Sequence, residues 1–163
     1  MTIAAQTLPS AARLRLRLVG QLKSSANWLF AITILSLVNA AFDFTGSRWT
    51  FVVGLGITQI VSAVARHIGP TGEIVGFVIV AAVASLFSIL GLLARRGHGW
   101  ALVVGMLLYA LDGLLFLLAR DWLSLAFHAY AVFSMYRGLR ALSGLRALSR
   151  AQAIDPARLA FDA

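Results

Sequence analysis

The chain has 163 residues, of which 60% are hydrophobic and only 12% charged, and its net charge is +8. Soluble domains of this size carry about a quarter charged residues, so the expected solvent of this chain is a bilayer. The sequence has no cysteine, which excludes disulfides, thiolate catalysis and cysteine-ligated metal sites.

Residues 1–26 form a basic stretch without a single acidic residue. Its basic side chains are Arg13, Arg15, Arg17 and Lys23. As a helix, this stretch would lie in the membrane interface, with its leucines in lipid and its arginines reaching the phosphates. An organelle transit peptide, or a cleaved signal peptide ending near Ala40, would share these features. Our main expectation is an uncleaved first membrane helix.

Five apolar segments follow, with charges almost only at their ends. They lie at about 28–44, 49–66, 74–94, 99–119 and 122–138. Inside hydrocarbon only helices and closed barrels satisfy the backbone hydrogen bonds, and these segments lack the alternating pattern of barrel strands. A tryptophan stands at the start of four of them, as expected at the headgroup level. We therefore predict an all-α, polytopic transmembrane bundle of five hydrophobic helices.

The number of crossings stays open between four and five. Five full crossings would place the termini on opposite faces and divide the 14 basic residues almost evenly. If the first segment stays on the inner side, or the last lies flat, most basic residues fall on the inner side. The positive-inside rule therefore favours four crossings with both termini cytoplasmic, whereas tight connections at 45–48 and 120–121 favour five.

The chain divides into a basic amphipathic segment (1–26), a transmembrane bundle (27–138) and a basic amphipathic tail (139–163). The tail region holds an identical duplication, because residues 138–143 and 144–149 both read Gly-Leu-Arg-Ala-Leu-Ser. We expect basic interfacial helices at both ends of the bundle, in contact with anionic lipids. Charges placed this way fit lipid headgroups, and we do not expect a nucleic-acid partner.

Two ionisable residues lie inside the last two apolar segments. Along their own helices, Asp112 and His128 are each roughly 10 to 12 Å below the connection at 120–121. An antiparallel hairpin would make them nearly level, and Tyr109 would share the helix face of Asp112. Three alternatives follow: a proton- or cation-binding site, a structural polar contact between helices, or no contact between Asp112 and His128. The structural contact is our main expectation.

A secondary polar stripe is predicted in the first two apolar segments. Ser36 and Asn39 fall on one helical face of the first segment, and Gln59 lies in the second. Such stripes either line a wet path or form hydrogen bonds across helices, and packing is the more common use.

No catalytic, cofactor or metal motif stands out. The three histidines lie on separate segments without the i, i+4 pair of zinc hydrolases, and no Gly-x-Ser-x-Gly motif is present. We expect no enzymatic activity, no cofactor and no metal. The predicted function is a non-enzymatic packing or assembly role, in a homo-oligomer or as a subunit of a membrane assembly. The alternative is a small proton- or cation-linked transporter or channel.

Three segments carry a family resemblance: residues 27–39, 54–59 and 109–116. They resemble parts of small bacterial multi-span inner-membrane proteins, a family without an established activity. The resemblance covers about residues 27–140 and implies a multi-pass protein of the bacterial inner membrane. It assigns no role to any single residue.

Overall fold

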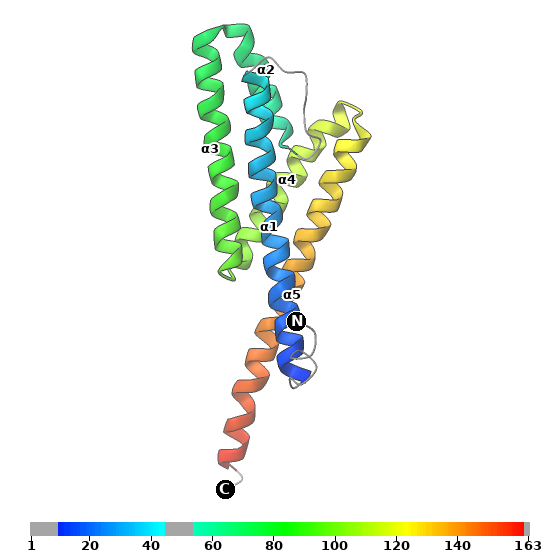
Figure 1. Cartoon of the computed structure of the whole chain (residues 1–163). Helices are drawn as coiled ribbons and strands as arrows, with labels where there is room; N and C mark the ends of the chain where they lie inside the picture. Colours follow the sequence, from blue (N-terminus) through cyan, green and yellow to red (C-terminus); the bar gives the residue numbers. More distant parts are fainter. Residues whose placement is uncertain (1–9, 45–53, 162–163) are drawn as a thin grey trace, which may run out of the picture.

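The computed structural model describes residues 10–44 and 54–161, with side chains described for residues 10–42 and 54–151. Within these ranges all regular secondary structure is helical, without strands (Figure 1). The helices are α1 (Ser10–Phe44), α2 (Gly56–Ile68), α3 (Pro70–Arg95), α4 (Gly99–Leu118) and α5 (Trp122–Phe161). Three of them, α1, α3 and α4, are long and apolar enough to cross a membrane. The predicted all-α class is therefore confirmed for the described residues.

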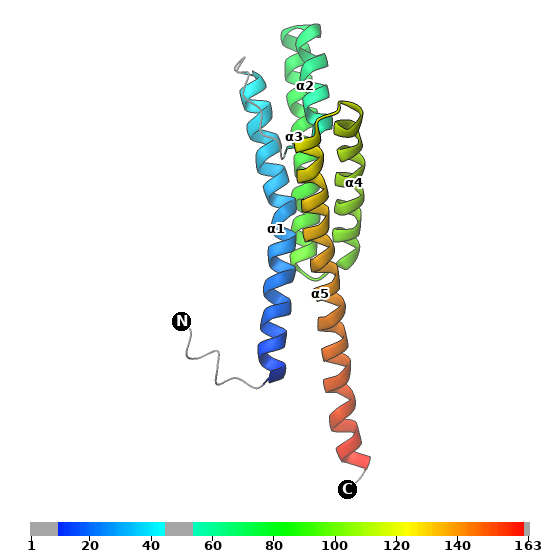
Figure 2. The same cartoon turned by 90° about the vertical axis from the view of Figure 1, so that its right-hand side faces the viewer.

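The long helices form an antiparallel bundle, in which α1 and α4 run in one direction and α3 and α5 in the other (Figures 1 and 2). The α2–α3 and α4–α5 turns lie at one end. The other end holds the α3–α4 turn, the start of α1 and the C-terminal half of α5, which projects beyond the bundle. We call this second end the basic end, because ten described basic side chains lie there: Arg13, Arg15, Arg17, Lys23, Arg95, Arg96, Arg137, Arg140, Arg146 and Arg150.

The helix in the second predicted segment, 49–66, is shorter than expected. α2 has 13 residues and is therefore about 20 Å long, whereas a hydrocarbon core is about 30 Å thick; residues 49–53 lie outside the described part. Leu55, the residue before α2, contacts Ser36 of α1, and the first residue of α2 contacts Asp112 of α4. Both partners lie more than a turn from the end of their helix, so α2 begins inside the bundle.

The turns follow from local sequence signals. Gly69 has a φ of 89°, a left-handed conformation that favours glycine, and Pro70 occupies the first position of α3, where its missing N–H costs nothing. In the α4–α5 turn Arg120 has a φ of 58°. Asp121 follows it and accepts the backbone N–H of Ser124 at 3.1 Å, which caps the start of α5.

The basic stretches at the two ends are continuous with the bundle helices. α1 runs unbroken through the predicted boundary at residue 26, and α5 runs unbroken through that at residue 138. We expected separate basic helices, but no proline interrupts either boundary. The glycines of the duplicated hexapeptide instead serve packing, since a Cβ at Gly138 would meet Ser25 and one at Gly144 would meet Leu18 of α1.

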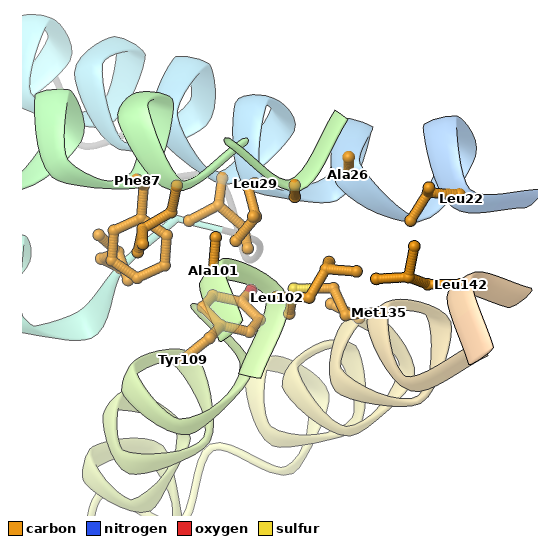
Figure 3. Packing of buried hydrophobic residues seen from close by; sticks show 14 residues of the cluster. Leu22, Ala26, Leu29, Phe87, Ala101, Leu102, Tyr109, Met135 and Leu142 are labelled. Carbon is orange, nitrogen blue, oxygen red and sulfur yellow. The ribbon is translucent and has the colours of Figure 1, made fainter. Parts of the chain in front are cut away.

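The apolar core lies where α1, α3, α4 and α5 meet (Figure 3). Its labelled members are Leu22, Ala26, Leu29, Phe87, Ala101, Leu102, Tyr109, Met135 and Leu142. Large apolar side chains also cover the outward faces, where Ile74, Val78 and Leu111 are each more than half exposed. A bundle that is apolar both inside and outside is expected for helices surrounded by lipid.

Candidate functional site

The structure brings Asp112 of α4 and His128 of α5 into direct contact. The imidazole Nε2 of His128 lies 3.0 Å from the carboxylate Oδ2 of Asp112. Both residues are buried, with 6% of Asp112 and 2% of His128 exposed. The short α4–α5 connection therefore places two ionisable side chains, 16 positions apart, at the same level of the bundle.

The Asp112 carboxylate also holds the start of α2. Its Oδ2 accepts the backbone N–H of Gly56 at 2.7 Å, and its Oδ1 accepts that of Ile57 at 2.8 Å. The first N–H groups of a helix have no partner within the helix, and together they carry a partial positive charge. A carboxylate is therefore a favourable partner, and Asp112 connects α2, α4 and α5 through one side chain.

A second hydrogen bond helps to hold the same helix start. The backbone N–H of Leu55, the residue before α2, donates to the Ser36 hydroxyl at 3.0 Å. Ser36 and Asn39 are both buried in α1, and a Cβ at Gly54 would collide with the Asn39 amide. Two residues of the predicted polar stripe thus face the segment that leads into α2. The third, Gln59, is half-buried in the first turn of α2 itself.

The hydrogen bonds of His128 determine how many protons the pair holds. Its Nδ1 lies 2.8 Å from the Ser124 carbonyl oxygen, which can only accept, so Nδ1 carries a proton. The contact between Nε2 and the Asp112 carboxyl group then needs a second proton, on either the imidazole or the carboxyl group. In both cases the pair is neutral overall, which is the state that a low-dielectric interior favours.

Aromatic rings surround the imidazole. Tyr109 stacks on His128 with 4.0 Å between ring centroids and 13° between the planes, and Phe116 lies 4.9 Å away. A Cβ at Gly113 would lie 3.1 Å from the His128 Cβ, so the glycine allows α4 and α5 to approach closely here. The structure thus places Tyr109 with Asp112 and His128 in one buried cluster.

The turn between α4 and α5 supports this cluster from outside. The Ser124 hydroxyl donates to Asp121 Oδ2 at 2.5 Å, and its backbone N–H donates to Oδ1. These hydrogen bonds, the hydroxyl bond first, hold the pKa of Asp121 below its usual value of about 3.8. Ser124 therefore joins the exposed cap at Asp121 to the buried ring of His128.

The polar groups of the bundle are satisfied within the chain. In the part of the chain that the structure describes, every buried side-chain nitrogen or oxygen has a hydrogen-bond partner. Away from the cluster, the Thr33 hydroxyl lies 3.2 Å from the Ala84 carbonyl oxygen, and Ser88 donates to Thr33 at 3.3 Å. These contacts join α1 to α3.

Sequence reasoning did not identify the backbone groups of Gly56 and Ile57 as part of the site. A backbone N–H has no signature in the sequence, and its partner Asp112 lies more than 50 positions away. Comparison of the chain with protein-family models, curated proteins and solved structures gives no match. The site is therefore interpreted from its geometry, and the resemblance to small bacterial inner-membrane proteins stays a prediction.

Proposed function

We propose that this chain is a multi-pass integral membrane protein with a non-enzymatic packing or assembly role. The observation that carries this proposal is the set of contacts of Asp112. An ionisable group in a membrane interior is costly, so it needs a compensating role. Here both carboxylate oxygens are used to join three helices, which is what a structural polar contact requires.

The proposed topology has four crossings, made by α1, α3, α4 and α5. The 20 residues of α4 give a length of about 30 Å, and the part of α5 from Trp122 to Arg140 gives about 27 Å. Both lengths suit a bilayer core of about 30 Å. α2 would begin inside the bundle, where Asp112 caps its first N–H groups, and run to the outer side. Both termini then lie on the same side.

The distribution of charge supports this orientation. Among the side chains that the structure describes, ten Lys and Arg residues lie at the basic end. The other end carries only two, Arg66 and Arg120. The positive-inside rule then makes the basic end cytoplasmic. Arg48 lies outside the described residues. We infer a location in a bacterial inner membrane, with the chain in a homo-oligomer or as a subunit of a larger assembly.

The test of the structural role uses Asp112→Asn and His128→Ala, purified and reconstituted into liposomes. Thermal stability and pH-dependent ion flux are measured on the same preparations. A structural role predicts that both variants lose stability and that the parent protein carries no flux. Flux in the parent that disappears in variants of unchanged stability would contradict it.

A second candidate function is a small proton- or cation-linked transporter or channel. The observation that favours it is a short helix that begins inside the bundle opposite an ionisable pair, an arrangement that membrane transporters use at their binding sites. The 3.0 Å contact between His128 Nε2 and Asp112 Oδ2 also joins two side chains that can each carry a proton. The liposome flux measurement separates this candidate from the structural role.

A further inference from the structure

A groove of about 360 Å³ lies between α1 and α5 at the basic end. Leu18 and Gln21 line it from α1, and Phe133, Tyr136, Arg137 and Arg140 line it from α5. None of these residues takes part in the Asp112–His128 cluster, and the groove opens on the outer surface of the bundle. The groove is therefore a different site from the buried Asp112–His128 cluster.

Four of the five residues that line the groove from α5 form one stripe along the helix. Phe133, Tyr136, Arg137 and Arg140 follow at steps of three and four residues, which places them on a single helical face. α5 runs toward the basic end, so the two arginines lie about 6 Å closer to that end than the two aromatic rings. Phe133 is 57% and Tyr136 47% exposed, so an apolar wall adjoins a pair of cations.

Contacts place this groove at the same level as the α3–α4 turn. The Arg95 Nε–H donates to the Asn27 side-chain oxygen at 3.1 Å, and a Cβ at Gly99 would lie 3.5 Å from Leu139. In the proposed topology this level is the headgroup region of the inner leaflet.

The two arginines have guanidinium groups available for a ligand. Arg137 and Arg140 are exposed, and neither makes a hydrogen bond or ion pair with the side chains that the structure describes. Across the groove stands Gln21, which is neutral. The groove therefore offers two cations and no compensating acid, and guanidinium groups bind phosphate oxygens through paired, charge-assisted hydrogen bonds.

We propose that this groove binds one anionic phospholipid of the inner leaflet. Arg137 and Arg140 hold the headgroup phosphate, Gln21 donates to it from α1, and an acyl chain lies along Phe133 and Tyr136. The inference rests on the proposed function, because that topology brings the groove to the headgroup level. It goes further in naming the site and the class of ligand.

The test is native mass spectrometry of the full chain in a neutral detergent, titrated with phosphatidylglycerol or phosphatidylcholine. Arg137→Gln/Arg140→Gln is compared with the matched control Arg13→Gln/Arg150→Gln, which removes the same charge. Arg150 lies about 15 Å beyond Arg140 along α5, and Arg13 about 12 Å from Gln21 along α1. Both distances exceed the Debye length of about 10 Å at 0.1 M salt.

We expect the groove variant to weaken phosphatidylglycerol binding about tenfold or more, and the control no more than about twofold. Gln21→Glu, which places a carboxylate opposite the arginines from the other helix, is expected to weaken it as well. Phosphatidylcholine is expected to bind more weakly than phosphatidylglycerol to the parent. Melting curves without added lipid verify that all variants are folded.

Equal losses in the groove variant and the control would overturn the proposal, because they would indicate general charge attraction. Displacement of the lipid by millimolar inorganic phosphate or glycerol phosphate would also overturn it, since the site would then take free phosphate. These measurements are made in detergent and do not depend on orientation in a bilayer. Failure of the proposed topology would instead appear in side-specific labelling, so the two failures are distinguishable.

Discussion

The Asp112 carboxylate accepts the backbone N–H of Gly56 at 2.7 Å, so a side chain in the middle of α4 fixes where α2 begins. A helix start inside hydrocarbon would leave several N–H groups without partners. The bundle supplies acceptors from two other helices, Asp112 from α4 and Ser36 from α1. A short helix can therefore begin within the bundle instead of crossing the whole membrane.

The first prediction concerns Asp112→Ala. The substitution leaves the N–H groups of Gly56 and Ile57 and the ring of His128 without their partner, so we expect the free energy of unfolding to fall by about 3 kcal/mol. Asp112→Asn retains one carbonyl oxygen and is expected to cost less. Reversible denaturation in mixed micelles measures both. Leu111→Ala, a neighbouring outward-facing position on α4, is the control and should have little effect.

The second prediction is thermodynamic coupling between Asp112 and His128. In a double-mutant cycle with Asp112→Asn and His128→Gln, the double variant should lose at least about 1 kcal/mol less than the sum of the single variants. A parallel cycle with Asp112→Asn and Ser88→Ala should be additive within about 0.5 kcal/mol, because Ser88 bonds to Thr33 on α1 instead. Additivity in both cycles would show that the 3.0 Å contact contributes no stability.

The third prediction concerns pH. The hydrogen bonds from Ser124 lower the pKa of Asp121 in the folded chain, so the ionised carboxylate contributes stability above the unfolded pKa of about 3.8. That contribution is lost as the pH falls through the lower folded pKa. Asp121→Ala should therefore destabilise the protein by about 1 kcal/mol at neutral pH, and the difference from the parent should shrink near pH 3.

Melting curves of the parent and of Asp121→Ala across this pH range make the comparison. Asp121→Asn keeps an acceptor for the Ser124 N–H without a titrating group, so its stability relative to Asp121→Ala should not change with pH. If the stability difference between the parent and Asp121→Ala instead increased as the pH fell, the prediction would be wrong.

The fourth prediction compares two helical glycines. A Cβ at Gly138 would lie 2.7 Å from the Ser25 hydroxyl oxygen and 3.5 Å from Leu102, so Gly138→Ala should separate α1 from α5 and cost about 1 to 3 kcal/mol. At Gly20 a Cβ meets nothing within 4 Å, so Gly20→Ala should stabilise α1 by up to about 1 kcal/mol. Unfolding in mixed micelles measures both, and equal effects would contradict the packing seen at Gly138.

The main helices could be predicted from the sequence because their signals are local. Apolar segments of spanning length predicted α3 and α4. The rise of a helix and the short connection at 120–121 placed Asp112 and His128 at one level. In the structure their polar atoms are 3.0 Å apart.

The start of α2 could not be predicted, because its cause is tertiary. The apolar run of 49–66 is almost long enough to span, and only the acceptors on Ser36 and Asp112 fix a start at Gly56. The structure of the basic stretches at the two ends of the chain could not be predicted either. Whether a basic stretch forms a separate surface helix or extends a bundle helix depends on contacts such as that between Gly138 and Ser25.

The central claim is that four helices cross the bilayer, with α2 reaching only from the outer side to the level of Asp112. Side-specific labelling of single cysteines in membranes tests it most directly, in a chain with no cysteine of its own. We predict that Ser10→Cys, Arg96→Cys and Ser149→Cys react only from the cytoplasmic side, and Thr71→Cys and Ala119→Cys only from the other. Labelling of Ser10→Cys and Ser149→Cys from opposite sides would contradict the account.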